Sequence, residues 1–152
     1  MCRFTKGIVA AIPGWFLMNS WSYYSKSIGF TELRFADWVS LIIYGNLAKN
    51  GAELGFALFL HLMFISFLTV IFSYLIPFIN YSSVWLKAIL YAIIVGFFIY
   101  AIPTLLSFPH LTRTSLGTVA SNFTGALIWA LTMAYTLLYL DKNIETTNEF
   151  IP

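Results

Sequence analysis

His61 is the one strongly titratable side chain within residues 55–79, an apolar stretch that contains no Asp, Glu, Lys or Arg. It lies about 9 Å beyond the start of that stretch if the segment is helical. A buried histidine is unfavourable in lipid, so an ionisable residue at this depth is a functional candidate. Other polar residues are expected toward the same end of the molecule. Together they form the candidate polar cluster: Asn19, His61, His110 and Asn122.

Asp37 and Glu53 are expected at the same end, and two histidines with two carboxylates are a donor set for a divalent metal. Their spacing matches no metal signature, however, and the four residues come from separate segments. A hydrogen-bonded histidine near the lipid headgroups is therefore the favoured interpretation. The sequence also lacks the GxGxxG, Walker, HExxH and GxSxG motifs. We expect no metal, no cofactor and no catalytic residue.

The elements that position these residues are apolar stretches long enough to cross a bilayer, which takes about 20 residues. The chain is 60% hydrophobic and 9% charged, whereas soluble domains carry about 25% charged residues. Backbone polar groups in lipid must pair internally, which favours helices. We predict an all-α fold with four transmembrane helices in one domain, residues 1–140, followed by a polar tail, 141–152. The predicted spans are 7–24, 55–79, 84–106 and 119–140.

A shorter helix is predicted in the connection between the first two spans, with Thr31 as its N-cap and Tyr44 near its end. Its apolar residues recur at the i, i+3, i+4, i+7 positions of one helix face. The segment is too short to span, so it should lie in the interface or against the bundle. The apolar face consists of Phe35, Trp38, Val39 and Ile42.

Small residues recur at every fourth position in the last two spans, which allows helix backbones to approach closely in lipid. The first span has two such pairs, Gly7 with Ala11 and Ala10 with Gly14. We expect the small faces of the last two spans to meet. The predicted packing residues are Ala88, Ala92 and Gly96 on one span and Ala126, Ala130 and Ala134 on the other.

The net charge of +2 is too small to favour a nucleic-acid partner, and the expected surroundings are the lipid bilayer. Basic residues beside the first span usually fix orientation. Arg3 and Lys6 lie there without acidic neighbours. We therefore predict that both termini are cytoplasmic.

Four segments carry a resemblance to known proteins: KGIVAAIPGWF at the first span, LRFADW after it, HLMFISF in the second span and SNFTGALIW in the fourth. In these segments the chain resembles small four-span bacterial inner-membrane proteins, including the YagU-like group. The resemblance implies a bacterial origin, an inner-membrane location and four helices. It implies no substrate and no catalytic role.

Two functions are compatible with these features. The favoured one is a non-enzymatic small subunit or accessory factor that acts through helix packing, with a second copy or another membrane protein as partner. The alternative is a small oligomeric transporter or permease for a neutral or apolar solute, and a membrane enzyme ranks third. The transporter alternative is supported by the polar residues within the spans: Asn19, His61, Ser66, Thr69 and Asn122.

Overall fold

The computed structural model describes residues 1–78, 83–108, 111 and 114–148, and it describes their side chains up to Asp141 apart from that of Phe78. Within these residues the fold is all-α, as predicted, with five α-helices and one 3-10 turn. His110 lies outside the described residues. The elements are α1 Arg3–Ser27, α2 Phe35–Tyr44, α3 Gly51–Leu75, η1 Ile76–Phe78, α4 Val84–Leu105 and α5 Leu116–Asn148.

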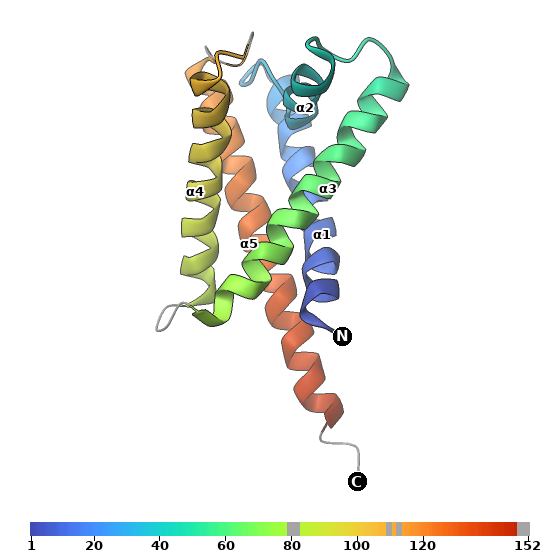
Figure 1. Ribbon diagram of the computed structural model, residues 1–152, viewed down its shortest axis with the longest axis vertical. Helices are drawn as coiled ribbons and strands as arrows, with labels where there is room; N and C mark the ends of the chain where they lie inside the picture. The colour runs from blue at the N-terminus through green and yellow to red at the C-terminus, as the bar shows by residue number, and fades with distance from the viewer. Residues whose placement is uncertain (79–82, 109–110, 112–113, 149–152) are drawn as a thin grey trace.

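The four long helices run up and down, and the short α2 lies at one end between α3 and α4 (Figure 1). Helix α1 packs against both α3 and α5, while α4 packs against α5 and α2 against α3. An ion pair between Lys6 and Asp141 joins the start of α1 to the lower part of α5. The chain therefore begins at the end of the bundle opposite α2.

Glycines on α1 bring its backbone close to both neighbouring helices. A Cβ atom on Gly7 would lie 2.8 Å from Val70 Cα of α3, and one on Gly14 would lie 2.8 Å from Trp129 Cδ1 of α5. The neighbouring positions Ala10 and Ala11 are fully buried. The small-residue pairs predicted in the first span thus form the interfaces with both α3 and α5.

Three helices are long and apolar enough to cross a membrane among the residues that the structure describes: Gly51–Leu75, Val84–Leu105 and Leu116–Asp141. The chain is therefore a polytopic helical membrane protein. Helix α1 is as long as α3 but is less apolar, because its inward face consists of small and polar residues. That face comprises Gly7, Ala10, Ala11, Gly14, Met18, Asn19, Ser22 and Ser25.

The short helix differs from its prediction at its first residue. It begins at Phe35 with Arg34 as N-cap, so the assignment of Thr31 as N-cap was wrong. The Arg34 backbone N–H donates to Asp37 Oδ2 over 2.9 Å, whereas Thr31 Oγ1 donates to Leu33 O and is 3.2 Å from Thr118 Oγ1. At the other end Gly45 adopts φ +69°, a left-handed conformation that stops the helix.

Beyond residue 140 the chain continues as helix: α5 extends through Asn148, so the first residues of the predicted polar tail are helical. The small residues of α4 and α5 lie in the interior. Ala88, Ala92, Ala130 and Ala134 belong to one buried core, and Ala126 packs against it. A Cβ atom on Gly96 would lie 2.9 Å from the Phe123 ring.

Helices α3 and α4 are joined near η1 and diverge toward α2 (Figure 1). At the joined end Tyr91 donates from its hydroxyl to Leu68 O over 2.8 Å, and its ring centroid is 5.2 Å from that of Phe72. Lys87 Nζ donates to Ile76 O over 3.1 Å. These contacts close the lower part of the α3–α4 interface, while its upper part stays open.

We predict that Gly7→Ala destabilises the bundle, because the added methyl group meets the backbone of α3, which cannot move aside as a side chain can. Overpacking of this kind costs about 1–3 kcal/mol. Gly55→Ala in α3 is the matched control, since a Cβ atom there meets nothing within 4 Å. Thermal unfolding of the purified protein in mild detergent should show a lower midpoint for the Gly7 variant only. Equal midpoints for the two variants would contradict this packing.

Candidate ligand-binding site

A cavity of about 390 Å³ lies where α3 and α4 diverge. Every α-helix contributes to its lining, and we call it the lateral cavity. Its volume is within the range of about 300–1,000 Å³ that is usual for small-molecule sites. The lining residues are Met18, Phe35, Trp38, Val39, Ile42, Ile43, Leu60, His61, Phe64, Ile65, Val95, Gly96, Ile99, Tyr100, Ile102, Pro103, Asn122, Phe123, Ala126 and Trp129.

His61 lies on the α3 wall of the lateral cavity and is 4% exposed. Asn19 Nδ2 of α1 is 3.3 Å from His61 Nδ1, and the same nitrogen donates to Trp15 O over 2.8 Å. Because Trp15 O only accepts, it fixes the orientation of the Asn19 amide. An amide nitrogen only donates, so His61 Nδ1 is the acceptor. The neutral imidazole therefore carries its proton on Nε2.

The ring of His61 also stacks on Phe35 of α2, with centroids 5.3 Å apart and planes inclined by 20°. Phe35 itself is held from two directions. Its backbone N–H donates to Ser22 Oγ of α1 over 3.2 Å, and its ring packs on Gly125 of α5, where a Cβ atom would lie 2.7 Å from Phe35 Cε2. The Phe35 side chain thus positions the His61 ring from the α2 side of the lateral cavity.

A second polar group lies on the wall formed by α4 and α5. Asn122 Nδ2 donates to the Tyr100 hydroxyl oxygen over 3.0 Å. The Tyr100 ring stacks on Phe123 with centroids 6.0 Å apart and meets Trp38 of α2 edge-on at 5.0 Å. The hydroxyl accepts from Asn122, so its own proton stays available for a further bond.

Four buried polar atoms have no hydrogen-bond partner among the described residues: Trp15 Nε1, Asn19 Oδ1, Trp38 Nε1 and Asn122 Oδ1. An unpaired buried donor or acceptor costs about 1–3 kcal/mol. Trp38 and Asn122 both line the lateral cavity, and they are 4% and 6% exposed. The cavity thus has one unsatisfied donor and one unsatisfied acceptor on residues of its lining.

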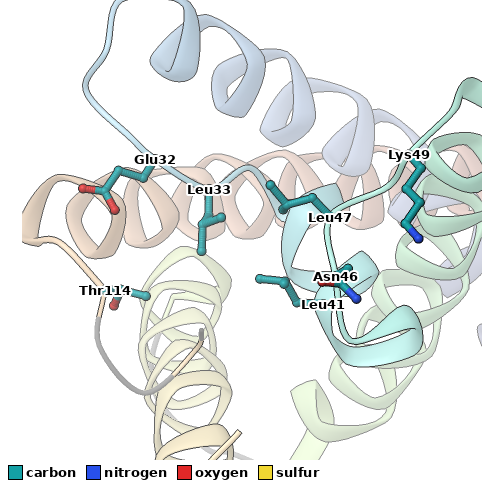
Figure 2. Close-up of a pocket in the computed structure, with 7 residues that line it drawn as sticks. All are labelled: Glu32, Leu33, Leu41, Asn46, Leu47, Lys49 and Thr114. Carbon is teal, nitrogen blue, oxygen red and sulfur yellow. The ribbon is translucent and has the colours of Figure 1, made fainter. Parts of the chain in front are cut away.

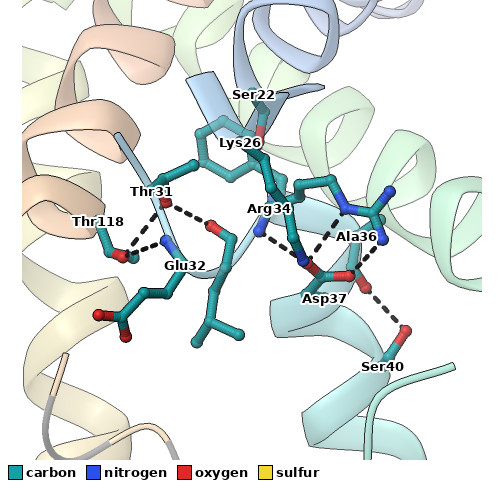
Figure 3. Close-up of polar contacts among 11 residues, drawn as sticks. Ser22, Lys26, Thr31, Glu32, Arg34, Ala36, Asp37, Ser40 and Thr118 are labelled. Atoms are coloured by element: carbon teal, nitrogen blue, oxygen red, sulfur yellow. Dashed lines mark hydrogen bonds and ion pairs between the residues drawn. The ribbon is translucent and has the colours of Figure 1, made fainter. Parts of the chain in front are cut away.

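Helix α2 is fixed to α1 by a buried carboxylate at its first turn (Figure 3). Asp37 is 2% exposed and accepts from Lys26 Nζ over 2.7 Å and from Arg34 Nη2 over 2.8 Å. Burial raises the pKa of the Asp37 carboxyl, but the hydrogen bonds from Arg34 and Lys26 outweigh it, and the pKa is lowered overall. Asp37 is thus an anion with two cationic partners.

A broader depression of about 610 Å³ lies beside the loops at the α2 end (Figure 2). Glu32 and Lys49 lie on opposite sides of it, and the residues between them are mostly apolar. Asn46 and Thr114 complete the rim. Both charged side chains are on residues exposed to solvent. The lateral cavity is the better candidate because its polar atoms are buried and oriented by contacts between helices.

The structure brings together part of the predicted polar cluster. Asn19 and His61 are in contact, and Asn122 lines the same cavity but is bonded to Tyr100. No group of three or more His, Cys, Asp or Glu side chains able to hold a metal occurs within the described residues. The carboxylate of Glu53 accepts from Lys49 N over 2.7 Å, at the start of α3.

The sequence analysis missed Trp38 and Tyr100 as site residues. The signal for Trp38 was present, because the four residues of the predicted apolar face on the short helix all line the lateral cavity. In the sequence analysis this helix lies in the interface or against the bundle, and its apolar face is assigned to no binding site. Tyr100 gave no signal, since one tyrosine in an apolar span is ordinary at the sequence level.

No protein-family model matches the chain, and comparison with curated proteins and with solved structures gives no match either. The resemblance to the YagU-like group stays a prediction.

We predict that Asp37→Asn lowers the free energy of unfolding by about 2 kcal/mol at neutral pH, because it weakens the three charge-assisted hydrogen bonds from Lys26 and Arg34. The pKa of this carboxyl is lower in the folded protein than its ordinary value of 3.8. Its stabilisation is therefore present above that pH and is lost as the pH falls through the folded pKa. The difference between the unfolding midpoints of parent and variant, measured from about pH 7 to pH 3, should narrow in acid. A difference independent of pH would contradict this role.

Proposed function

We propose that the protein is a non-enzymatic membrane protein that crosses the bilayer four times and holds a neutral lipophilic molecule in the lateral cavity. The observation that carries the proposal is the cavity itself, about 390 Å³ bounded by five helices. Among the described residues, its lining contains no Asp, Glu, Lys, Arg or Cys. A charged ligand would lose its hydration there without gaining a counter-ion, which is strongly unfavourable.

The proposal of a fourth span rests on the contacts of α1. Gly7 approaches Val70 near one end of the helix, and Ser25 Oγ lies 2.7 Å from Ser121 Oγ near the other. Between them Asn19 contacts His61. Helix α1 is therefore bound to two candidate spans along its length, so it lies at the same depth as they do.

The outward face of α1 is apolar, as a lipid-facing surface requires. Ile12 is 51% exposed and Phe16 is 62% exposed, and Ile8, Val9 and Leu17 lie on the same outer surface. Both glycines and three of the polar residues that lower the mean hydropathy of this helix are buried: Gly7, Gly14, Asn19, Ser22 and Ser25. Packing between helices thus explains why a spanning segment is less apolar than the other three.

We propose further that the membrane is a bacterial cytoplasmic membrane, with both termini on the cytoplasmic side. The bacterial membrane rests on the resemblance to the YagU-like group, and two observations support the cytoplasmic placement of the termini. Arg3 and Lys6 precede the first span, and the ion pair between Lys6 and Asp141 holds the start of α1 beside the end of the last span. An even number of spans is required for that arrangement.

Cysteine labelling tests the topology directly, because Cys2 is the only cysteine and is exposed. In inside-out vesicles the parent should react with a membrane-impermeant maleimide. A Cys2→Ser, Asn46→Cys variant, with its cysteine in the loop before α3, should react only in cells or right-side-out vesicles. Labelling of both proteins from one side would contradict a spanning α1.

Holding a ligand is favoured over transport because the lateral cavity has a floor. Trp129 lines the cavity and donates from Nε1 to Thr69 Oγ1 of α3 over 3.2 Å. Nearer to η1, Tyr91 joins α4 to Leu68 of α3. The cavity therefore lies in the α2 half of the bundle, and these contacts bridge the helices beneath it. An accessory factor that presents or stores a lipophile fits this shape.

We predict that Ile99→Trp, which places a larger side chain in the cavity lining, reduces binding of a neutral lipophile at least tenfold. Ile94→Trp on the same helix is the control, because Ile94 is 55% exposed and does not line the cavity. Tritiated decylbenzene is the probe, and scintillation proximity on the protein in nanodiscs measures saturable binding. Equal affinities for the two variants, or no saturable binding by the parent, would contradict the proposal.

A further inference from the structure

We propose that the lateral cavity recognises a flat, neutral ring with carbonyl oxygens on opposite sides and an apolar tail, the chemistry of a membrane quinone. This inference rests on the proposed function, since it names the class of lipophile that the cavity takes. Three observations carry it: the aromatic lining, the excess of hydrogen-bond donors over acceptors, and the placement of those donors on facing walls.

Aromatic side chains form much of the lateral cavity. Phe35 and Trp38 come from α2, Phe64 from α3 and Tyr100 from α4, while Phe123 and Trp129 come from α5. Aromatic pairs prefer offset-stacked or edge-to-face arrangements, which a planar ring adopts and a branched aliphatic group does not. The cavity therefore favours a planar ring over a purely aliphatic ligand.

The polar atoms of the lining are mainly donors. His61 carries its proton on Nε2, because Nδ1 accepts from Asn19, and no hydrogen bond reaches that Nε2 within the described residues. Trp38 Nε1 lacks an acceptor among the same residues. The Tyr100 hydroxyl keeps its proton while it accepts from Asn122. A ligand that supplies oxygen acceptors satisfies these groups, and each buried N–H gains a partner.

The donors lie on different helices that face one another across the opening. His61 is on α3, whereas Trp38 meets Tyr100 of α4 edge-on. A ring with a single carbonyl reaches one wall, and a ring with two opposed carbonyls reaches both. The recognising groups belong to the α2 half of the bundle, where α3 and α4 diverge (Figure 1), so the tail extends from the lateral cavity toward lipid.

Paired probes test this recognition: 2-decyl-1,4-benzoquinone and decylbenzene, which share the tail and the six-membered ring but differ in the carbonyl oxygens. Both are measured by saturable binding to the full chain in nanodiscs, and the readout is the ratio of their affinities. The parent should prefer the quinone at least tenfold, since each hydrogen bond contributes a factor of about five. The ratio cancels losses of packing that affect both probes.

Trp38→Phe should reduce this preference about fivefold, by removing one N–H. Trp15→Phe is the matched control, because Trp15 Nε1 is also buried and unpartnered in the described residues but Trp15 does not line the cavity. Its ratio should equal that of the parent. His61→Phe keeps a ring against Phe35 and should also lower the preference; if it does not fold, Trp38→Phe alone carries the test.

Each remaining outcome overturns a defined part of the inference. Equal affinities of the parent for both probes would refute carbonyl recognition and leave the cavity as a lipophile site. Absence of saturable binding by either probe would refute the proposed function as well. Stronger binding of decyl-hydroquinone than of the quinone would assign recognition to the acceptor Asn122 Oδ1 and overturn the carbonyl assignment.

Discussion

The arrangement of the bundle depends on the close approach of α1 to two helices at once. In lipid the hydrophobic effect does not drive helices together, so association depends on packing and on hydrogen bonds between helices. Gly7 and Gly14 lie about two turns apart on α1, and each allows a neighbouring helix to within a distance that a Cβ atom would obstruct. Helix α4 packs mainly on α5, and near η1 it is also joined to α3 by the hydrogen bond from Tyr91 to Leu68. Beyond that contact α4 diverges from α3.

Polar side chains secure the end of the bundle where the long helices diverge. Trp21 Nε1 donates to Ser121 O over 3.0 Å, and Glu32 N donates to Thr118 Oγ1 over 3.0 Å (Figure 3). These bonds tie α1 and the loop after it to the start of α5. Asp37 then holds α2 against that loop through Arg34 and against α1 through Lys26. These bonds hold the short helix over the lateral cavity. Without them, its apolar side chains would face lipid.

Sequence periodicity was sufficient to predict the helices and much of the interior. The stretches 55–79 and 84–106 correspond closely to α3 with η1 and to α4. The predicted N-cap of α2 was wrong because the Asp37 carboxylate accepts a hydrogen bond from the backbone N–H of Arg34. This role of Asp37 could not be inferred from the sequence, because its cationic partners Lys26 and Arg34 surround it only in the fold. Asn19 and His61 were predicted toward the same end of the molecule, and their side chains lie in contact. The lateral cavity was not predictable, because it depends on the angle between α3 and α4, and no periodicity in either helix specifies that angle.

The position of the cavity follows from a change of side-chain size along one face of α4. Ala88, Ala92 and Gly96 recur every fourth residue and lie in the interior, and the next residue in this series is Tyr100. Small residues there allow close approach to α5, whereas a tyrosine requires space and a partner for its hydroxyl. The corresponding series on α5 begins at Asn122, which supplies that partner. The alanine interface thus ends in a tyrosine–asparagine hydrogen bond at the depth where α3 has moved away. The face of α4 that packs against α5 along most of its length therefore also supplies a polar group to the otherwise apolar wall of the lateral cavity.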